Sequence, residues 1–221
     1  MKKLLQGVSE FMGNIHETEL ALFTSLAHGQ SPDSFFVTCS DSRVAPHLIT
    51  QTGPGELFVL RNAGNFIPEE PASGEAATIE YAASVLEVQD AILCGHSDCG
   101  AVKALLNPPP AGQLPSIDLW LRHGSEVLEI LSRHPEWQGQ TRIDRAIEIN
   151  VLVQLTRLSR HPAVAKRLAD GSLRLHAWVY DIGAGEIRAF DSEQGRFEAI
   201  AEARATPVPA HNLAVVPHLA S

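Results

Sequence analysis

Short runs of apolar residues recur along the chain and predict β-strands. Three of them, Phe35–Cys39, Leu57–Leu60 and Ala91–Cys94, are continuous and do not alternate, which indicates strands buried on both faces. Leu173–Tyr180 alternates apolar with polar or aromatic residues and predicts a fourth strand. The glycine-containing turn after it predicts a hairpin to Glu186–Phe190 at the edge of the sheet.

Segments with apolar residues at helical spacing surround and separate these strands. The predicted helices are Lys2–Asn14, Glu17–Ala27, Gly74–Val88, Ala101–Leu106, Arg142–Ser159 and a short helix from Pro162 to Gly171. Helices between buried strands predict an α/β fold with a central, mainly parallel sheet covered by helices. No linker divides the sequence, so we expect a single domain over residues 1–221, with residues 206–221 as a proline-containing extension.

Composition and charge narrow the classes of protein that fit this pattern. Of the 221 residues, 44% are hydrophobic and 19% are charged, so the chain can bury a full core. No apolar run approaches the ~18 residues needed to span a bilayer, and polar residues interrupt the N-terminal apolar stretch. We therefore expect a cytoplasmic protein with no membrane partner. The net charge of −9 argues against nucleic-acid binding.

Thiol and imidazole side chains lie where two of the predicted strands end. Cys39 ends the first strand, and His96 and Cys99 follow the third. Ligands of an open α/β sheet bind at the carboxyl ends of its strands, so we expect these three side chains to converge. Two cysteines and one histidine suit catalytic zinc with one open coordination position, and a helix N-terminus at Cys99 favours the thiolate.

Other roles for these residues stay open at this point. His-x-x-Cys alone also occurs in protein cores, and three cysteines in a reducing compartment do not indicate a disulfide framework. Either thiol of the set can instead be a nucleophile. We interpret Cys94, inside the third strand, as a packed core thiol. Asp41 and Arg43 can form a charge-assisted pair beside Cys39, or an ordinary surface or helix-capping ion pair.

The two segments Cys39-Ser40-Asp41-Ser42-Arg43 and His96-Ser97-Asp98-Cys99-Gly100 resemble the paired signature of the β-class carbonic anhydrases. The resemblance covers most of the chain, from Gln30 to Phe190. Further similar pieces are Gly55–Asn65, Ser73–Tyr81, Asn150–Gln154 and Gly171–Asp181.

This resemblance implies a fold, a cofactor and a reaction. The implied cofactor is one zinc per subunit, bound by Cys39, His96 and Cys99. The implied reaction is the reversible hydration of carbon dioxide to bicarbonate and a proton by zinc-bound hydroxide. The implied fold is a sheet of four parallel strands plus an antiparallel edge strand. The resemblance also implies that an N-terminal helical arm, residues 1–29, embraces a partner in a homodimer or a dimer-based higher oligomer.

A subgroup can be assigned from single positions. The plant-type, open-site members bind substrate with a set of residues that match Gln30, Phe58, Ala63, Tyr81 and Gly100. The allosterically closing members carry a tryptophan at the position of Phe36, so this sequence is similar to the plant-type group. Two positions depart from the usual pattern: Ala177 replaces a glycine, and Asp98 fills a variable position with a negative charge near the metal.

Charge arguments add a mechanism to the resemblance. Asp41 would orient the zinc-bound water, and Arg43 would hold Asp41 ionised and in place. Without the Arg43 contact, Asp41 can swing onto the metal as a conditional fourth ligand in a closed state. Two thiolates and a neutral imidazole cancel the charge of zinc, so we expect the bound water to have a pKa above ~7 and activity to favour alkaline pH.

Two other functions fit the same sequence. A carbon disulfide-type hydrolase on this scaffold would share the zinc ligands. A catalytically silent zinc-binding scaffold protein would keep the fold, but it would be expected to lack Asp41 or Arg43, and both are present.

Overall fold

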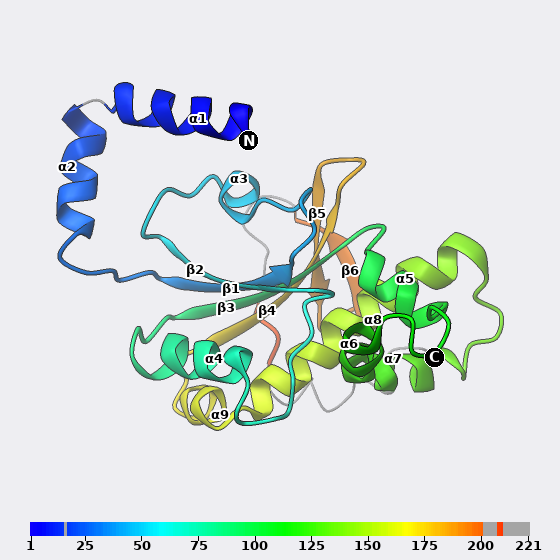
Figure 1. The fold of residues 1–221 in the computed structure, drawn as a ribbon. Helices are drawn as coiled ribbons and strands as arrows, with labels where there is room; N and C mark the ends of the chain where they lie inside the picture. Colours follow the sequence, from blue (N-terminus) through cyan, green and yellow to red (C-terminus); the bar gives the residue numbers. More distant parts are fainter. Residues whose placement is uncertain (16, 201–206, 210–221) are drawn as a thin grey trace. The chain divides into compact units, whose positions relative to one another are not determined.

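The apolar runs form a six-stranded sheet in the computed structural model, which describes residues 1–15, 17–200 and 207–209 (Figure 1). The strand order is β2-β1-β3-β4-β5-β6. The strands are β1 (Ser34–Cys39), β2 (Leu57–Asn62), β3 (Asp90–His96), β4 (Arg174–Asp181), β5 (Glu186–Asp191) and β6 (Arg196–Ala199). The first four pair in parallel, and β5 and β6 are antiparallel. The predicted α/β fold with a mainly parallel sheet is confirmed.

The structure divides into two compact units, Met1–Ser31 and Pro32–Ser221. The first unit contains α1 (Lys2–Gly13) and α2 (Glu17–Leu26), as the sequence predicts. The rings of Phe11 and Phe23 pack edge to face within it, with centroids 5.8 Å apart. The boundary after Ser31 lies close to the predicted end of the arm at residue 29. The assignment of residues 1–221 to a single domain stays a prediction.

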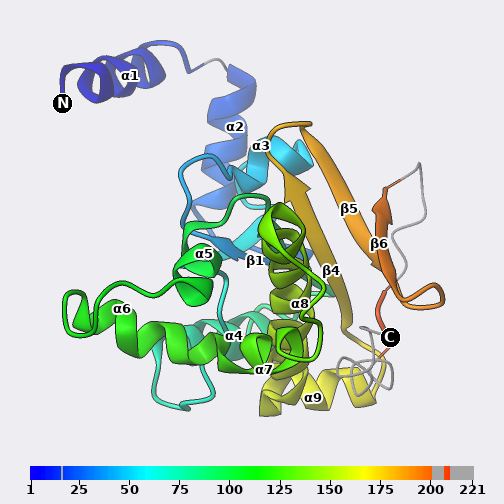
Figure 2. The ribbon, with the colours of Figure 1, turned by 90° about the vertical axis from the view of Figure 1, so that its right-hand side faces the viewer.

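Helices of the second unit pack on the sheet and form the main core with it (Figures 1 and 2). Their bounds are α3 (Pro46–Thr50), α4 (Gly74–Ser84), α5 (Gly100–Leu106), α6 (Pro115–Trp120), α7 (Ser125–Leu131), α8 (Gly139–Arg160) and α9 (Pro162–Ala169), with a 3₁₀ turn at Leu121–Gly124. The longest, α8, contacts both β3 and β4. Its residues Ala146–Thr156 are all buried, which ties the centre of the sheet to one rigid helix.

Local sequence signals explain several of the helix starts. Ser73 caps α4, because its hydroxyl accepts a hydrogen bond from the Ala76 N–H at 3.0 Å. Pro46, Pro115 and Pro162 stand in the first turns of α3, α6 and α9, where a missing N–H costs nothing. The predicted helix over Gly74–Val88 ends earlier, at Ser84, and Glu87 adopts a left-handed conformation with φ 51°.

Besides the 3₁₀ turn, four of the described helices and strands were not predicted from the apolar pattern. These are α3, α6, α7 and the outer strand β6, which lies beside β5. All four are short, so none of them contains enough repeats of a period to be detected. Most of the predicted extension 206–221 lies outside the described residues. Within 207–209, Val208 is buried, and its N–H donates to the Leu175 carbonyl oxygen at 2.7 Å.

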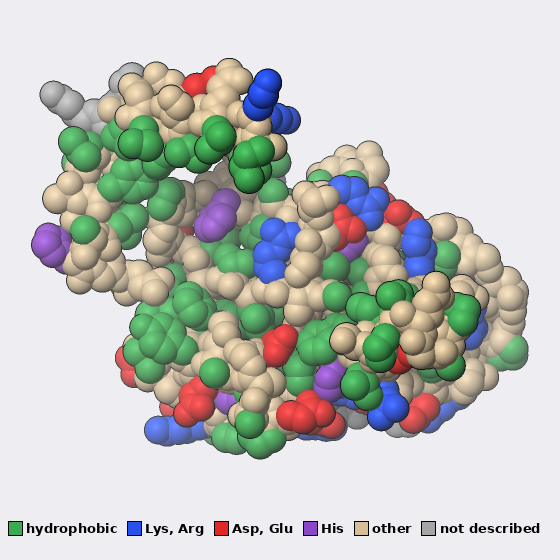
Figure 3. All heavy atoms as spheres, in the orientation of Figure 1, with side chains coloured by type: hydrophobic (Ala, Val, Ile, Leu, Met, Phe, Trp, Pro, Cys, Tyr) green, Lys and Arg blue, Asp and Glu red, His purple; other side chains and the backbone are tan. Residues whose placement is uncertain are grey.

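Two surface properties bear on partners. None of the described helices is long and apolar enough to cross a membrane. On the face drawn in Figure 3, Lys and Arg side chains lie among Asp and Glu side chains. The sequence as a whole has fewer basic than acidic residues, 17 Lys and Arg against 26 Asp and Glu.

Candidate metal centre

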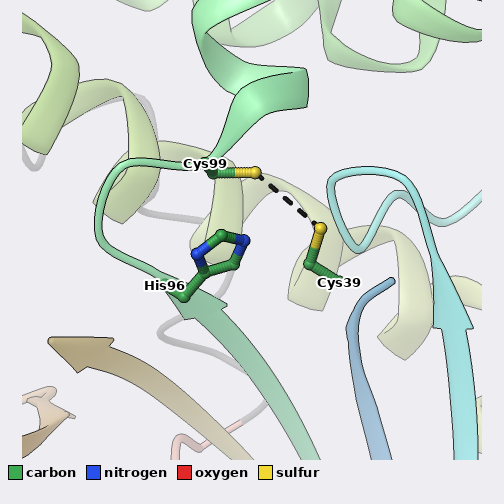
Figure 4. A group of neighbouring side chains, drawn as sticks. All are labelled: Cys39, His96 and Cys99. Carbon is green, nitrogen blue, oxygen red and sulfur yellow. Dashed lines mark hydrogen bonds between the residues drawn. The ribbon is translucent and has the colours of Figure 1, made fainter. Parts of the chain in front are cut away.

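Cys39, His96 and Cys99 converge at the carboxyl end of the parallel strands (Figure 4). Cys39 is the last residue of β1, His96 is the last residue of β3, and Cys99 is the N-cap of α5. The two Sγ atoms lie 4.0 Å apart, and the three ligand atoms all lie within 4.8 Å of one another. All three side chains are buried. The predicted convergence is confirmed.

The orientation of the His96 ring is set by its backbone neighbour. Nδ1 lies 2.9 Å from the Ser97 carbonyl oxygen, an acceptor, so Nδ1 carries the proton and donates it there. Nε2 then presents a lone pair. This atom is buried and has no hydrogen-bond partner among the described residues. A buried polar atom without a partner is costly, and a metal ligand position is the ordinary way to satisfy it.

The sulfur atoms of Cys39 and Cys99 are within hydrogen-bonding contact of each other. Hydrogen bonding from the Cys99 thiol, together with the Gly64 N–H at 3.3 Å, lowers the pKa of Cys39 despite its burial. The same contact with Cys39, together with burial, raises the pKa of Cys99. This contact favours the thiolate form of Cys39, and a bound divalent ion would favour the thiolate form of Cys99 as well.

Cys94 differs from this pair. It is fully buried within β3, and desolvation raises the pKa of its thiol to about 12. Its interpretation as a core thiol agrees with these surroundings.

The donor set fits a tetrahedral zinc ion. Zn–S bonds of about 2.3 Å place two sulfurs of a tetrahedron about 3.8 Å apart, close to the observed separation of the Cys39 and Cys99 sulfurs. Three protein ligands leave one position for water or substrate, as in catalytic zinc sites. The nearby carboxylate is that of Asp41, whose Oδ2 lies 3.9 Å from the His96 Nε2.

Asp41 and Arg43 form the predicted charge-assisted pair. The Arg43 Nε and Nη2 atoms donate to the two carboxylate oxygens of Asp41 at 2.9 and 2.8 Å, and the Arg43 N–H donates at 2.9 Å. These bonds hold the pKa of Asp41 far below its usual range. Asp41 is thus an ionised acceptor at the edge of the three ligands.

Arg61 is a contributor that the sequence analysis missed. It pairs with Thr38 in the register of β1 and β2. Its Nε donates to the Cys39 carbonyl oxygen at 3.0 Å and its Nη2 to the Asp41 carbonyl oxygen at 2.7 Å. Arg61 therefore fixes the backbone that carries one ligand and the dyad acid. Its role depends on the pairing of β1 with β2, which the sequence analysis did not specify.

The predicted substrate residues do not all meet at the metal centre of one subunit. Gly100 follows Cys99 directly, and Ala63 precedes the Gly64 N–H that contacts Cys39. Phe58 and Tyr81 contact each other, with ring centroids 5.7 Å apart. Phe58 stands opposite Phe35 in the sheet, whereas Cys39 stands opposite Asn62, so Phe58 lies about 13 Å down the strands from the metal ligand.

Gln30 belongs to the N-terminal unit, which is described by itself. Its role in substrate binding stays a prediction.

Comparisons with known proteins agree with this geometry. The sequence model of the carbonic anhydrase family matches residues 34–187. A carbonic anhydrase of Pseudomonas aeruginosa is 43% identical over 205 residues, which cover 91% of this chain and 93% of the relative. The solved β-carbonic anhydrase CcaA superposes with a TM-score of 0.88 at 40% identity, covering 95% and 94% of the two chains.

A further solved structure describes an assembly. One of two tetrameric β-carbonic anhydrases from Sordaria macrospora superposes with a TM-score of 0.75 at 28% identity, covering 90% of this chain and 98% of that one.

Proposed function

This chain belongs to the β-class carbonic anhydrase family, and from that premise we propose that it catalyses the reversible hydration of carbon dioxide to bicarbonate and a proton, with one zinc per subunit. Cys39, His96 and Cys99 would hold the metal. The observation that carries the proposal is the buried, unpartnered Nε2 of His96, which lies with two cysteine sulfurs and 3.9 Å from an ionised Asp41.

The metal would supply water activation, since a bound divalent ion lowers the pKa of water enough to give a nucleophile near neutral pH. The protein supplies the orientation. Asp41 has no proton to donate, so it can only accept a hydrogen bond from an attacking water. Arg43 occupies both carboxylate oxygens and keeps Asp41 turned toward itself.

The contact between Asp41 and Arg43 would also control whether the proposed site is open or closed. Loss of the Arg43 contacts would leave an ionised carboxylate close to the three ligands, free to occupy the fourth coordination position. We propose that Asp41 acts in this conditional way. Its hydrogen bonds with Arg43 favour the open state with an exchangeable position.

We further propose that a second copy of the chain completes the substrate pocket. Phe58 lies too far along the strands to line the metal centre of its own subunit. Tyr81, on α4, contacts the Phe58 ring and is 43% exposed. Residues of a partner subunit could reach the site across a dimer interface. Ala63 and Gly100, which neighbour the contacts of the metal ligands, would line the rest of the proposed pocket. The tetrameric relatives from Sordaria support a dimer or a dimer-based higher oligomer.

Stopped-flow hydration of carbon dioxide across pH, on protein of measured zinc content, tests this function. We expect turnover that scales with zinc content and favours alkaline pH. A zinc-loaded protein without turnover would support the silent scaffold protein. Measuring carbon disulfide hydrolysis on the same sample separates the two enzymatic candidates. The cytoplasmic location stays a prediction.

A further inference from the structure

Asp98 lies in the turn that connects β3 to α5, between two of the proposed metal ligands. Its backbone is left-handed, with φ 59°, a conformation that aspartate tolerates better than most residues. From this turn its carboxylate reaches the basic side chains Arg43 and Lys103. The sequence alone indicated only an extra negative charge near the metal.

Asp98 binds the part of the Arg43 guanidinium that Asp41 leaves free. Asp41 accepts from Nε and Nη2, as described above. Asp98 accepts from Nη1 through Oδ2 at 3.2 Å, and from Nη2 through its backbone carbonyl oxygen at 3.3 Å. A planar guanidinium that is bonded along two edges cannot rotate or swing away without breaking bonds on both sides.

Asp98 is itself held from the opposite side. The Lys103 Nζ lies 2.5 Å from Asp98 Oδ1, and Lys103 belongs to α5, which begins directly after Cys99. Alternating charges thus run from α5 through Asp98 and Arg43 to Asp41. This connection joins the segment that carries His96 and Cys99 to the segment that carries Cys39.

We propose that Asp98 is a positioning residue that keeps Arg43 on Asp41 and thereby keeps Asp41 off the metal. The proposal rests on the proposed function for its catalytic consequence. Each contact by itself is weak, because the side chains of Arg43, Asp98 and Lys103 are about half exposed. The contacts restrain Arg43 because they act together. Without Asp98, the Arg43 guanidinium would be hydrogen-bonded along one edge only.

The test uses zinc-loaded Asp98→Gly, since glycine accepts the left-handed backbone without strain. We expect kcat/KM for carbon dioxide hydration to fall about two- to fivefold with zinc content unchanged, as expected for loss of one half-exposed ion-pair partner. Azide affinity, measured by titration, should weaken by a similar factor, because Asp41 would compete for the exchangeable position. Asp98→Asn keeps the shape of the side chain and loses its charge. Its kcat/KM and its azide affinity should lie between those of the wild-type protein and Asp98→Gly.

The azide measurement separates positioning from simple charge. Removing a negative charge near the metal would strengthen anion binding, whereas release of Asp41 weakens it. The double variant Asp98→Gly/Arg43→Ala completes the test. If Asp98 acts through Arg43, adding Asp98→Gly to Arg43→Ala should not lower kcat/KM further. The matched control is Glu198→Gln, which removes one acid from the surface pair with Arg196 and should change neither quantity.

Three results would overturn the proposal. They are an unchanged rate in Asp98→Gly, tighter azide binding in that variant, and an equal loss of rate from Asp98→Gly in the presence and absence of Arg43. A zinc-loaded wild-type protein without hydration activity would refute the proposed function instead. Azide affinity would still report whether Asp98 keeps Asp41 off the metal.

Discussion

The Asp41 Oδ2 and the His96 Nε2 lie 3.9 Å apart, although the two residues follow different strands. Asp41 lies just beyond β1, and His96 ends β3, the neighbour of β1 in the sheet. The parallel pairing of these strands is what brings an ionised acceptor next to the proposed metal ligands. Substitutions of His96 and of Arg43, the partner of Asp41, therefore distinguish metal binding from orientation of the attacking water.

His96→Ala and Cys39→Ser are expected to lose zinc and, with it, hydration activity. Each removes one of three donors from a site in which Asp41 is the one spare carboxylate among the residues that the structure describes. Zinc content by mass spectrometry and stopped-flow rates on the same samples check this. Cys94→Ala is the matched control, since Cys94 only packs in the core and its truncation should cost about 1 kcal/mol of stability without loss of zinc. Full turnover by a zinc-free variant would contradict the assignment.

Arg43→Ala is expected to keep zinc and lose activity, by about ten- to hundredfold, the usual effect of removing a partner of the ligand shell. The substitution leaves the carboxylate of Asp41 without its two side-chain donors. Arg174→Ala is the control, because Arg174 makes a similar two-pronged contact with Asp90 at the other end of the sheet. Equal rates for the Arg43 variant and the wild-type protein would show that the pair has no catalytic role.

Subunit mixing tests whether Phe58 serves the site of a partner. A His96→Ala subunit keeps Phe58, and a Phe58→Ala subunit keeps the metal ligands, so a mixed dimer would contain one complete site. After random exchange of equal amounts, we expect recovery of about a quarter of wild-type activity, since half of the dimers are mixed and each has one complete site of two. A mixture of His96→Ala with Cys39→Ser should recover nothing. No recovery in the first mixture would show that Phe58 does not act across subunits.

The metal ligands could be predicted from the sequence because they lie at the end of a strand or in the turn directly after it. Cys39 and His96 are the last residues of two buried runs, and parallel strands bring such ends to one edge. The pocket role of Phe58 comes from the resemblance alone and stays a prediction. Its place near the start of β2 puts it at the wrong end of the strand for its own subunit.

Contacts that depend on side-chain direction could not be predicted in this way. The pairing of Asp98 with Arg43 depends on a left-handed backbone at Asp98, which no periodic pattern reports. The bonds from Arg61 to the backbone after β1 depend on strand order, which the sequence analysis did not specify. Strand β6 is too short to show a period, and Phe197 is its one aromatic residue.

Asp90 is expected to stabilise the fold in a pH-dependent way. Its carboxylate accepts from Arg174 and pairs with His176 Nε2 at 2.7 Å, and these contacts lower the pKa of Asp90. A lowered pKa in the folded state means that the contribution is present above the unfolded value of about 3.9 and is lost as the pH falls through the folded value.

Asp90→Asn should therefore cost about 1 kcal/mol of unfolding free energy at pH 7, with the difference shrinking below about pH 4. Urea unfolding at several pH values measures it. Exposed Glu186→Gln should show no such difference at any pH. A cost for the Asp90 variant that stays constant down to pH 2 would mean that its ion pairs are not the cause.

Gly95→Ala is expected to weaken both the fold and the metal centre. A Cβ at Gly95 would lie 2.6 Å from the Val151 Cγ2, so α8 or the end of β3 must move, and His96 is the next residue. Such overpacking costs about 1–3 kcal/mol, and we expect zinc to dissociate faster. Gly74→Ala is the matched control, since no atom lies within 4 Å of its added Cβ. Adding Val151→Ala to Gly95→Ala removes the contacting methyl group and should slow the loss of zinc. If the double variant loses zinc as fast as Gly95→Ala, the contact with Val151 is not the cause.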